Sequence, residues 1–374
     1  MMIYLDCAAT SFQKPKGVAL GINRALQTMA SPGRGCHRPA MAAADCVLNC
    51  RLLLASFFNV DDPEKVIFTF NATHGLNIAI NSLVKAGDKV VVSAFEHNAV
   101  MRPLTALGAD ICIAKSRLFD REGTIDAFVR SLRGAKCAVC THVSNVFGFI
   151  LPIEEIAAAC RKMQVPLIID ASQSAGILPL DFTALGAAFL AAPGHKGLLG
   201  PQGTGVLLCN CPATPILFGG TGSASANPLM PEFLPDRLEA GTHNVLGISG
   251  LLGGLSYVVS RPVGAIAAHE RALAASFAAE LSKVPRLRVY FCGEPGLQGG
   301  VVSILSEKIA CDELAERLGN MGICVRAGLH CAPSAHKTAG TFDSGTVRFS
   351  FSPFNSAGDA IAAANSLKKI LNNM

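Results

Sequence analysis

The sequence predicts an α/β fold with a mainly parallel central sheet, followed by a smaller C-terminal domain. Three observations support this: the length of 374 residues, short apolar runs that alternate with helical periodicity from about residue 60, and a change of pattern after Gly250. The expected strands are Val66–Phe70, Lys89–Ser93, Asp110–Ala114, Ala138–His142, Pro166–Asp170 and Ala187–Ala191.

Helices are expected between these strands. Apolar residues recur at three- and four-residue spacings in Thr73–Lys85 and Ile153–Lys162, which predicts helices that cross over from one parallel strand to the next. Sheets of this kind bind ligands in the loops beyond the carboxyl ends of their strands. Polar residues just after the apolar runs are therefore the first candidates for a site.

The pattern beyond Gly250 differs. An Ala-rich helical stretch continues to Leu281, and the chain then alternates between short strands and a helix over Asp312–Asn320. The short strands are expected around Val289, Val301, Val325 and Val347. We therefore predict a large domain over residues 16–250 and a small α+β domain over residues 251–374.

Charge and apolar segments exclude some partners. The net charge of +5 comes from 32 basic and 27 acidic residues without a dense Lys/Arg run, so neither nucleic acid nor a membrane surface is predicted as a partner. Met1–Thr10 contains Asp6 and lacks the features of a signal peptide, which predicts a cytoplasmic protein. Val245–Val259 is interrupted by Gly and Ser and is too short for a membrane span, so we expect a buried helix.

Fourteen cysteines are scattered along the chain, and reduced thiols are expected rather than a disulfide framework. Cys137 and Cys140 lie three residues apart in a strand, where their side chains face opposite sides of the sheet. Cys46 and Cys50 lie one helical turn apart with no second pair nearby, as in ordinary helix packing. No metal site is predicted.

Lys196 carries the strongest chemical signal. It lies in Pro193-Gly194-His195-Lys196-Gly197, directly after an apolar strand. A buried ammonium loses solvation, which lowers the lysine pKa and suits a lysine that forms a Schiff base. By itself the segment is weak support, because lysines are far commoner in surface turns.

Further polar residues lie at other strand ends. Asp170 ends one strand and Gln173 follows it; such a carboxylate can hold a pyridinium proton and such an amide can bind a phenolic oxygen. Asp170 would equally serve as a helix N-cap. The turn Asn71–Gly75 opens a helix, so the Ala72 backbone and the Thr73 hydroxyl can bind a phosphate, although an ordinary capping turn would look the same. The remaining strand-end groups are His97, Asn145 and Thr242, each common in turns.

Taken in order, these segments resemble the class V aminotransferase family and, within it, the cysteine desulfurases and selenocysteine lyases. The resemblance covers nearly the whole chain. It rests on Tyr4–Thr10, Glu96-His97-Asn98, Asp170–Gln173, Gly194-His195-Lys196 and Arg326–Ala332. It implies a fold-type I pyridoxal-phosphate (PLP) transferase with a seven-stranded sheet, in which residues 1–15 associate with the small domain.

The resemblance also implies roles. Lys196 would hold PLP, Cys331 would receive sulfur as a nucleophile, and His97 would stack on the cofactor and share in proton transfer. The ring and phosphate of PLP would be bound by Asp170, Gln173, His195, Ala72 and Thr73. The implied protein is a homodimer, in which Thr242 would reach the cofactor of the second subunit. The substrate would be bound by Arg348, Asn145 and Arg326.

Two positions depart from the family pattern. Pro193 replaces a phosphate-binding serine that is common in relatives, and it offers neither a hydroxyl nor a backbone donor. Leu329 takes the place of a second histidine before Cys331, so only His330 remains. Arg326 and His330 are both expected to lower the Cys331 pKa. The segment from Ala327 to Ser344 is expected to be a mobile loop.

The resulting hypothesis is a PLP-dependent cysteine desulfurase that converts L-cysteine to L-alanine and forms a persulfide on Cys331. A selenocysteine lyase, a cysteine sulfinate desulfinase or an aminotransferase would use the same scaffold. A non-enzymatic, thiol-rich scaffold for metal or iron–sulfur clusters is disfavoured by the absence of paired ligand spacings. The sulfur acceptor, whether a relay protein, an iron–sulfur cluster scaffold or a tRNA-modifying enzyme, leaves no recognisable motif.

Overall fold

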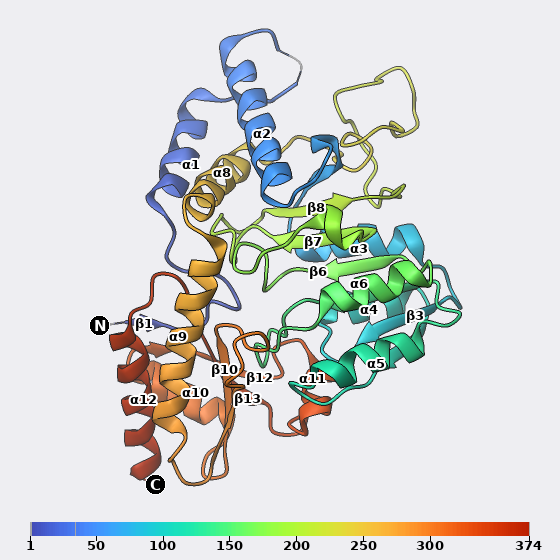
Figure 1. The fold of residues 1–374 in the computed structure, drawn as a ribbon. Helices are drawn as coiled ribbons and strands as arrows, with labels where there is room; N and C mark the ends of the chain where they lie inside the picture. Colours follow the sequence, from blue (N-terminus) through green and yellow to red (C-terminus); the bar gives the residue numbers. More distant parts are fainter. Residues whose placement is uncertain (1, 34, 374) are drawn as a thin grey trace.

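The large domain is built on a central sheet that is buried on both faces (Figure 1). The structure is a computed structural model, and it describes residues 2–33 and 35–373. The strand order is β2 (Val66–Thr69), β8 (Gly205–Cys209), β7 (Phe189–Pro193), β6 (Leu167–Asp170), β5 (Cys137–Thr141), β3 (Lys89–Ser93) and β4 (Asp110–Ala114). Only β8 runs antiparallel to the other six strands of this sheet, which confirms the predicted seven-stranded, mainly parallel sheet.

Side chains alternate between the two faces of the sheet. In β5, Cys137 packs into the apolar cluster on one face and Cys140 into the cluster on the other, as the sequence predicted. Leu76 and Leu104 cover the first face, and Phe128 and Ile156 cover the second. The covering helices are α3 (Ala72–Leu83), α4 (Asn98–Ala106), α5 (Arg121–Ser131), α6 (Ile153–Lys162) and the short α7 (Phe182–Leu185).

Three helices pack together beyond the β2 edge of the sheet: α1 (Lys16–Thr28), α2 (Arg38–Phe57) and α8 (Val245–Val259). The 3-10 turn η1 (Pro63–Lys65) leads into β2. Among the described residues, α2 is long and apolar enough to cross a membrane, although 44% of its apolar window is buried. Cys50 and Leu54 on its inner side lie in the core, as in the central helix of a globular domain.

The small domain has an antiparallel sheet in the order β12 (Arg326–Gly328), β13 (Thr346–Ser350), β10 (Val301–Ser306) and β9 (Leu287–Tyr290). Its helices are α9 (Val263–Leu281), α10 (Cys311–Asn320), α11 (Pro333–Ala339) and α12 (Ala357–Asn372). The N-terminal strand β1 (Ile3–Tyr4) pairs with β11 (Ile323–Cys324), and Leu5 enters the small-domain core. The N-terminal segment therefore joins the small domain, although it comes first in the chain.

The two apolar cores meet between α8 and α9. Leu251 and Leu255 in α8 belong to the large core, whereas Leu273 and Phe277 in α9 belong to the small one. Residue 250, where the sequence suggested a boundary, falls inside α8. The division between the domains is better placed at the turn over residues 260–262.

A buried ion pair fixes the loop that precedes α8. Arg51 and Glu239 lie 2.8 Å apart with side chains only 8% and 4% exposed, and Glu239 also accepts a hydrogen bond from the Phe68 backbone. Replacing Arg51 would leave a buried carboxylate, and loss of one partner in such a pair costs about 3–5 kcal/mol. We therefore expect Arg51→Met to lower the free energy of unfolding by that amount in urea denaturation.

The control for Arg51→Met is Arg130→Met. Arg130 is 3.9 Å from Asp126, and both side chains are about 70% exposed. Exposed pairs of this kind contribute at most about 1 kcal/mol. Equal losses for the two variants would show that the Arg51–Glu239 pair does not hold the loop.

Candidate functional site

A cavity of about 500 Å³ opens at the carboxyl ends of the parallel strands. It brings together every predicted cofactor-binding residue except Thr242. These residues are Ala72, Thr73, His97, Asn145, Asp170, Gln173, His195 and Lys196. Because they come from separate loops between residues 71 and 196, only the fold makes them neighbours.

Lys196 lies half-buried in the wall of this cavity. Burial lowers the pKa of its ammonium to about 8; the nearby Asp170 charge opposes this shift, and the Arg348 and Arg326 charges reinforce it. The lysine loop is packed tightly against the loop after β6. A Cβ on Gly176, whose φ is +85°, would lie 2.3 Å from the Gly197 carbonyl oxygen, so glycine is required there.

Asp170 ends β6 and is only 2% exposed. Its Oδ1 accepts a hydrogen bond of 2.9 Å from the Ser172 N–H, whereas Oδ2 accepts none from the described residues. Gln173 donates from Nε2 to the Ala8 carbonyl at 2.9 Å, which leaves its own oxygen available. Asp170 therefore presents a negative charge to the cavity, next to the open oxygen of Gln173.

Glu96 is a buried group to which the sequence analysis assigned no role. Its carboxyl accepts hydrogen bonds from the Ser93 hydroxyl and from the Thr141 N–H, which ties the end of β3 to the end of β5. Burial raises its pKa to about 8, and the Asp170 charge adds to this effect. A neutral Glu96 leaves Asp170 as the charged carboxylate of this region.

The first turn of α3 forms one wall of the cavity. Asn71 caps the helix by accepting a hydrogen bond from the His74 N–H. The N–H groups of Ala72 and Thr73 lie in the first turn, where helices leave backbone donors free, and the Thr73 side chain is exposed. This turn can bind an anion. Pro193 lines the same cavity and adds no donor there.

Two histidines at the cavity are neutral at physiological pH. Burial lowers the pKa of His97, and the Lys196 charge adds to this shift. His97 Nδ1 accepts a hydrogen bond of 3.0 Å from the Ala99 N–H, so the ring proton is assigned to Nε2. Burial likewise lowers the pKa of His195 to about 4, and its Nδ1 lies 3.0 Å from the Thr10 hydroxyl. Both rings can therefore act as hydrogen-bonding groups without adding positive charge.

Cys331 is exposed and lies on a segment that is attached to the rim of the cavity. Its carbonyl accepts a hydrogen bond from the Asn98 N–H at 2.7 Å, and the His330 carbonyl accepts one from Asn145 Nδ2 at 2.8 Å. His330 and Cys331 have φ angles of 49° and 56°, a strained left-handed backbone for residues other than glycine. Such strain concentrates at functional sites.

Two expectations about this segment are wrong. The imidazole of His330 is buried beside Thr346, and burial lowers its pKa to about 2, so it supplies no positive charge to the thiol. The stretch from Ala327 to Ser344 is also not an open loop, because it contains part of β12 and the helix α11. Within α11, Thr338 donates a hydrogen bond to the Ala94 carbonyl of the large domain.

The expected substrate-binding residues are only partly assembled. Arg348 is buried and donates to Asp6 Oδ1 at 2.6 Å and to the Asn145 carbonyl at 3.0 Å. Its Nε has no partner among the described residues. Arg326 is exposed on β12, directly across from Arg348. Asn145 lines the cavity, but neither arginine does.

Asp6 is a residue whose role the sequence did not reveal. It lies 342 positions before Arg348, and only the association of the N-terminal segment with β13 brings the two together. The segment Tyr4–Thr10 contributed to the family resemblance, but it did not indicate a role for Asp6.

Thr242 lies apart from the cavity, exposed on the loop before α8.

The residues described here contain no group of three or more His, Cys, Asp or Glu that could hold a metal ion. Most cysteines are buried or half-buried. Cys36 and Cys331 are the exposed ones in the part of the chain that the structure describes.

Comparison with known proteins gives a consistent result. The family model described as "Aminotransferase class-V" matches residues 3–361. A probable cysteine desulfurase of Methanothermobacter thermautotrophicus is 30% identical, with 98% of this chain and 94% of the relative covered. One from Pyrococcus abyssi is 33% identical, with 95% and 90% covered.

A solved structure has the same fold over the whole chain. The apo structure of a cysteine desulfurase from Thermococcus onnurineus NA1 superposes with a TM-score of 0.92 at 30% identity. The match covers 100% of this chain and 95% of that one. Both domains and the N-terminal segment therefore have counterparts in that structure.

Proposed function

Because the chain belongs to the class-V aminotransferase family, we propose that it is a PLP-dependent cysteine desulfurase that converts L-cysteine to L-alanine and transfers the sulfur to Cys331. The observation that carries the proposal is the combination of a half-buried, low-pKa lysine near Asp170 with an exposed cysteine held at the rim of the same cavity.

The residues of the cavity fit PLP. The free donors of the α3 turn suit its phosphate, the open carboxylate oxygen of Asp170 suits its ring nitrogen, and the Gln173 oxygen or amide suits a ring substituent. His195 would contact the phosphate and His97 the ring, and Lys196 would hold the cofactor covalently. When bound, PLP supplies an electron sink for the carbon attached to the substrate nitrogen.

The chain's own residues do the rest of the chemistry. Asn145, Arg348 and Arg326 orient the substrate carboxylate, which for Arg348 requires sharing its guanidinium between the substrate and Asp6. Lys196, once released, takes the proton from the substrate Cα. His97 shares in the proton transfers.

Sulfur transfer occurs at Cys331. Its thiolate attacks the substrate sulfur; a sulfur–sulfur bond forms as the carbon–sulfur bond breaks, and the bonding pair stays with carbon. Protonation of that carbon, and return to Cα of the proton that Lys196 took, complete alanine. One cysteine and one enzyme thiol thus give one alanine and one enzyme persulfide, so no external oxidant or reductant is needed.

Cofactor loading should depend on pH. The neutral amine of Lys196 is the nucleophile, and its fraction rises as pH rises through the lowered pKa of about 8. We expect the rate at which apoprotein gains a Schiff-base absorption band with PLP to increase up to about pH 8 and then level off. A rate that keeps rising steeply toward pH 10 would mean that Lys196 has an ordinary pKa.

One assay distinguishes cysteine desulfurase activity from the other reactions that this scaffold could support. Purified protein is incubated with PLP and L-cysteine without any keto acid, and alanine is measured. Alanine formation supports desulfuration, because an aminotransferase would need an amino acceptor. Selenocysteine and cysteine sulfinate are then compared with L-cysteine as substrates at equal concentration. No alanine from cysteine, together with turnover on one of the other two, would replace the proposed substrate.

A homodimer is part of the proposal. Large exposed apolar side chains gather on α1 and α2, and include Leu20, Leu26, Met41, Leu48 and Leu52. A surface hollow is lined by Leu48 and Thr242 together, so a second copy covering α2 would lie next to Thr242. This supports a Thr242 contact with the cofactor of the partner. We also propose that the protein is cytoplasmic. The persulfide sulfur would pass to an acceptor, such as a protein of iron–sulfur cluster assembly.

A further inference from the structure

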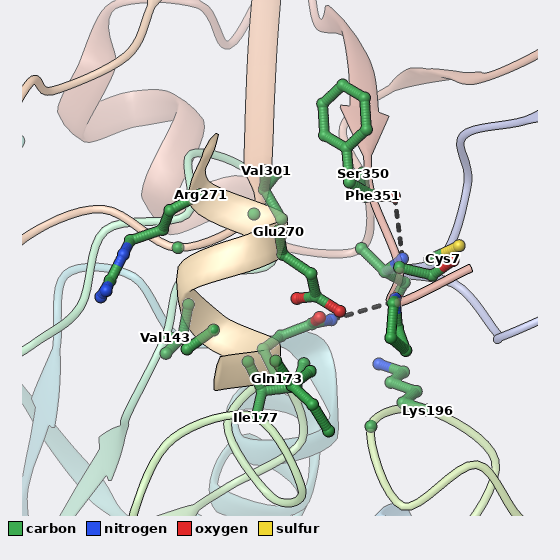
Figure 2. Close-up of a pocket in the computed structure, with 18 of the residues that line it drawn as sticks. Cys7, Val143, Gln173, Ile177, Lys196, Glu270, Arg271, Val301, Ser350 and Phe351 are labelled. Atoms are coloured by element: carbon green, nitrogen blue, oxygen red, sulfur yellow. Dashed lines mark hydrogen bonds between the residues drawn. The ribbon is translucent and has the colours of Figure 1, made fainter. Parts of the chain in front are cut away.

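A second cavity adjoins the first between the two domains. The two share Val143, Gln173 and Lys196 in their walls. The rest of its wall comes from the N-terminal segment with Cys7, from the large domain with Leu199, and from the small domain (Figure 2). Cavities between domains are common places for small ligands.

Glu270 is the unusual residue of this interdomain cavity. It is only 4% exposed, and its carboxyl has no hydrogen-bond or ion-pair partner among the residues described. Figure 2 shows it extending from α9 toward the segment that carries Cys7, whereas Arg271 points the other way. Arg271 instead donates to the Pro295 carbonyl at 3.0 Å.

Several other polar groups here are already engaged. Gln173 Nε2 donates to the Ala8 carbonyl at 2.9 Å, and the Ser350 hydroxyl accepts from the Ala8 N–H at 2.8 Å. Burial raises the pKa of the Cys7 thiol to about 12, so this thiol carries no charge. Glu270 is therefore a carboxyl without a partner in a mainly apolar wall, where the Gln173 oxygen also stays open.

A buried carboxyl without a partner is costly, and burial raises the pKa of Glu270 to about 8. A ligand that brings a positively charged N–H donor would remove that cost. A divalent metal ion needs about six oxygen ligands, which one carboxyl cannot supply. An anion would be repelled by the carboxylate. The cavity thus selects for a small cation with an apolar part.

We propose that the interdomain cavity binds a small organic amine, whose protonated nitrogen donates to the Glu270 carboxylate while its alkyl groups pack against Ile177, Leu199 and Ile266. The site requires the two domains and the N-terminal segment together, because each contributes part of the wall. The site is distinct from the cavity that contains Asp170 and His97, although Lys196 borders both.

The test uses a matched pair of probes with the PLP-loaded protein. Diethylammonium and diethyl ether have the same shape, but only diethylammonium carries a charge and N–H donors. A secondary amine is chosen because it cannot form a neutral imine with PLP. Saturation-transfer NMR titrations give both dissociation constants. We expect diethylammonium to bind at least about tenfold more tightly than the ether, since a buried charged hydrogen bond contributes about 1.5–3 kcal/mol.

Variants locate the binding. Glu270→Gln should remove the tenfold preference for diethylammonium, whereas Glu280→Gln, an exposed carboxylate on the same helix, should retain it. Ala267→Leu, which adds bulk to the cavity wall, should weaken the binding of both probes and serves as a second test if Glu270→Gln folds poorly. Thermal melting checks the folding of each variant.

The pH dependence gives an independent readout. Glu270 must be ionised to pair with the amine, and the groups that face it are the uncharged Cys7 thiol and Lys196. Binding of diethylammonium should tighten about tenfold from pH 6 to pH 7 and level off above pH 8. Glu270→Gln should abolish this dependence. Equal binding of amine and ether, no binding of the amine, or an unchanged Glu270→Gln variant would overturn the proposal.

Discussion

Replacing Cys331 by serine is expected to abolish alanine and persulfide formation from L-cysteine while leaving PLP bound. Serine keeps the size of the side chain but is a poor nucleophile toward sulfur, and Cys331 is not part of the wall that holds the cofactor. The backbone hydrogen bonds at residues 330 and 331 do not depend on the thiol. Loss of such a nucleophile lowers turnover by about 10³-fold or more. Alanine, persulfide and the absorption of the bound cofactor are measured on the same sample.

The matched control is Cys36→Ser. Cys36 is the other exposed cysteine of the described residues, so it tests whether any accessible thiol is sufficient. It should keep full activity. If Cys331→Ser also kept full activity with L-cysteine, another group would have to receive the sulfur, and the role of the strained segment would have to be reconsidered.

Replacing Lys196 by alanine is expected to have an effect of similar size through a different step. The variant loses both the covalent bond to the cofactor and the base that takes the Cα proton. General base catalysis alone contributes about 10²–10⁴-fold, so turnover should fall by at least that factor. The Schiff-base absorption band should be missing after incubation with PLP.

An exposed lysine on α6 provides the comparison. Lys162→Ala should load PLP and turn over L-cysteine as the unmodified protein does, because this side chain is exposed and does not line the cavity. Borohydride should bleach and fix the cofactor in Lys162→Ala but not in Lys196→Ala. A cofactor still fixed by borohydride in Lys196→Ala would show that a different lysine holds it.

Alternation of apolar runs was sufficient to predict much of the large domain. Six strands, β2 to β7, were anticipated within a few residues, because strands buried on both faces are continuous apolar segments. The strand β8 was not, since Gly200–Gly205 reads as a turn and masks its start. Its antiparallel direction follows from pairing between β2 and β7, which the local sequence does not encode.

The candidate site also combines residues that a local sequence pattern predicts with contacts that only the tertiary fold creates. Lys196 and Asp170 were predictable because each follows its own apolar strand. The Arg348–Asp6 pair joins the two ends of the chain, and no local pattern reveals it. The burial of His330 and Glu270 depends on tertiary packing, so neither the neutral ring nor the unpartnered carboxyl could be read from neighbouring residues.

In the proposed reaction, the sulfur of L-cysteine is transferred to Cys331. The most direct measurement is a single turnover, with L-cysteine supplied below the concentration of PLP-loaded protein, followed by alanine quantification and mass spectrometry of the peptide that contains Cys331. We expect one alanine per cysteine consumed, with one additional sulfur atom on Cys331. Alanine formed at that ratio with the extra sulfur on another cysteine, or free sulfide with Cys331 unmodified, would contradict it.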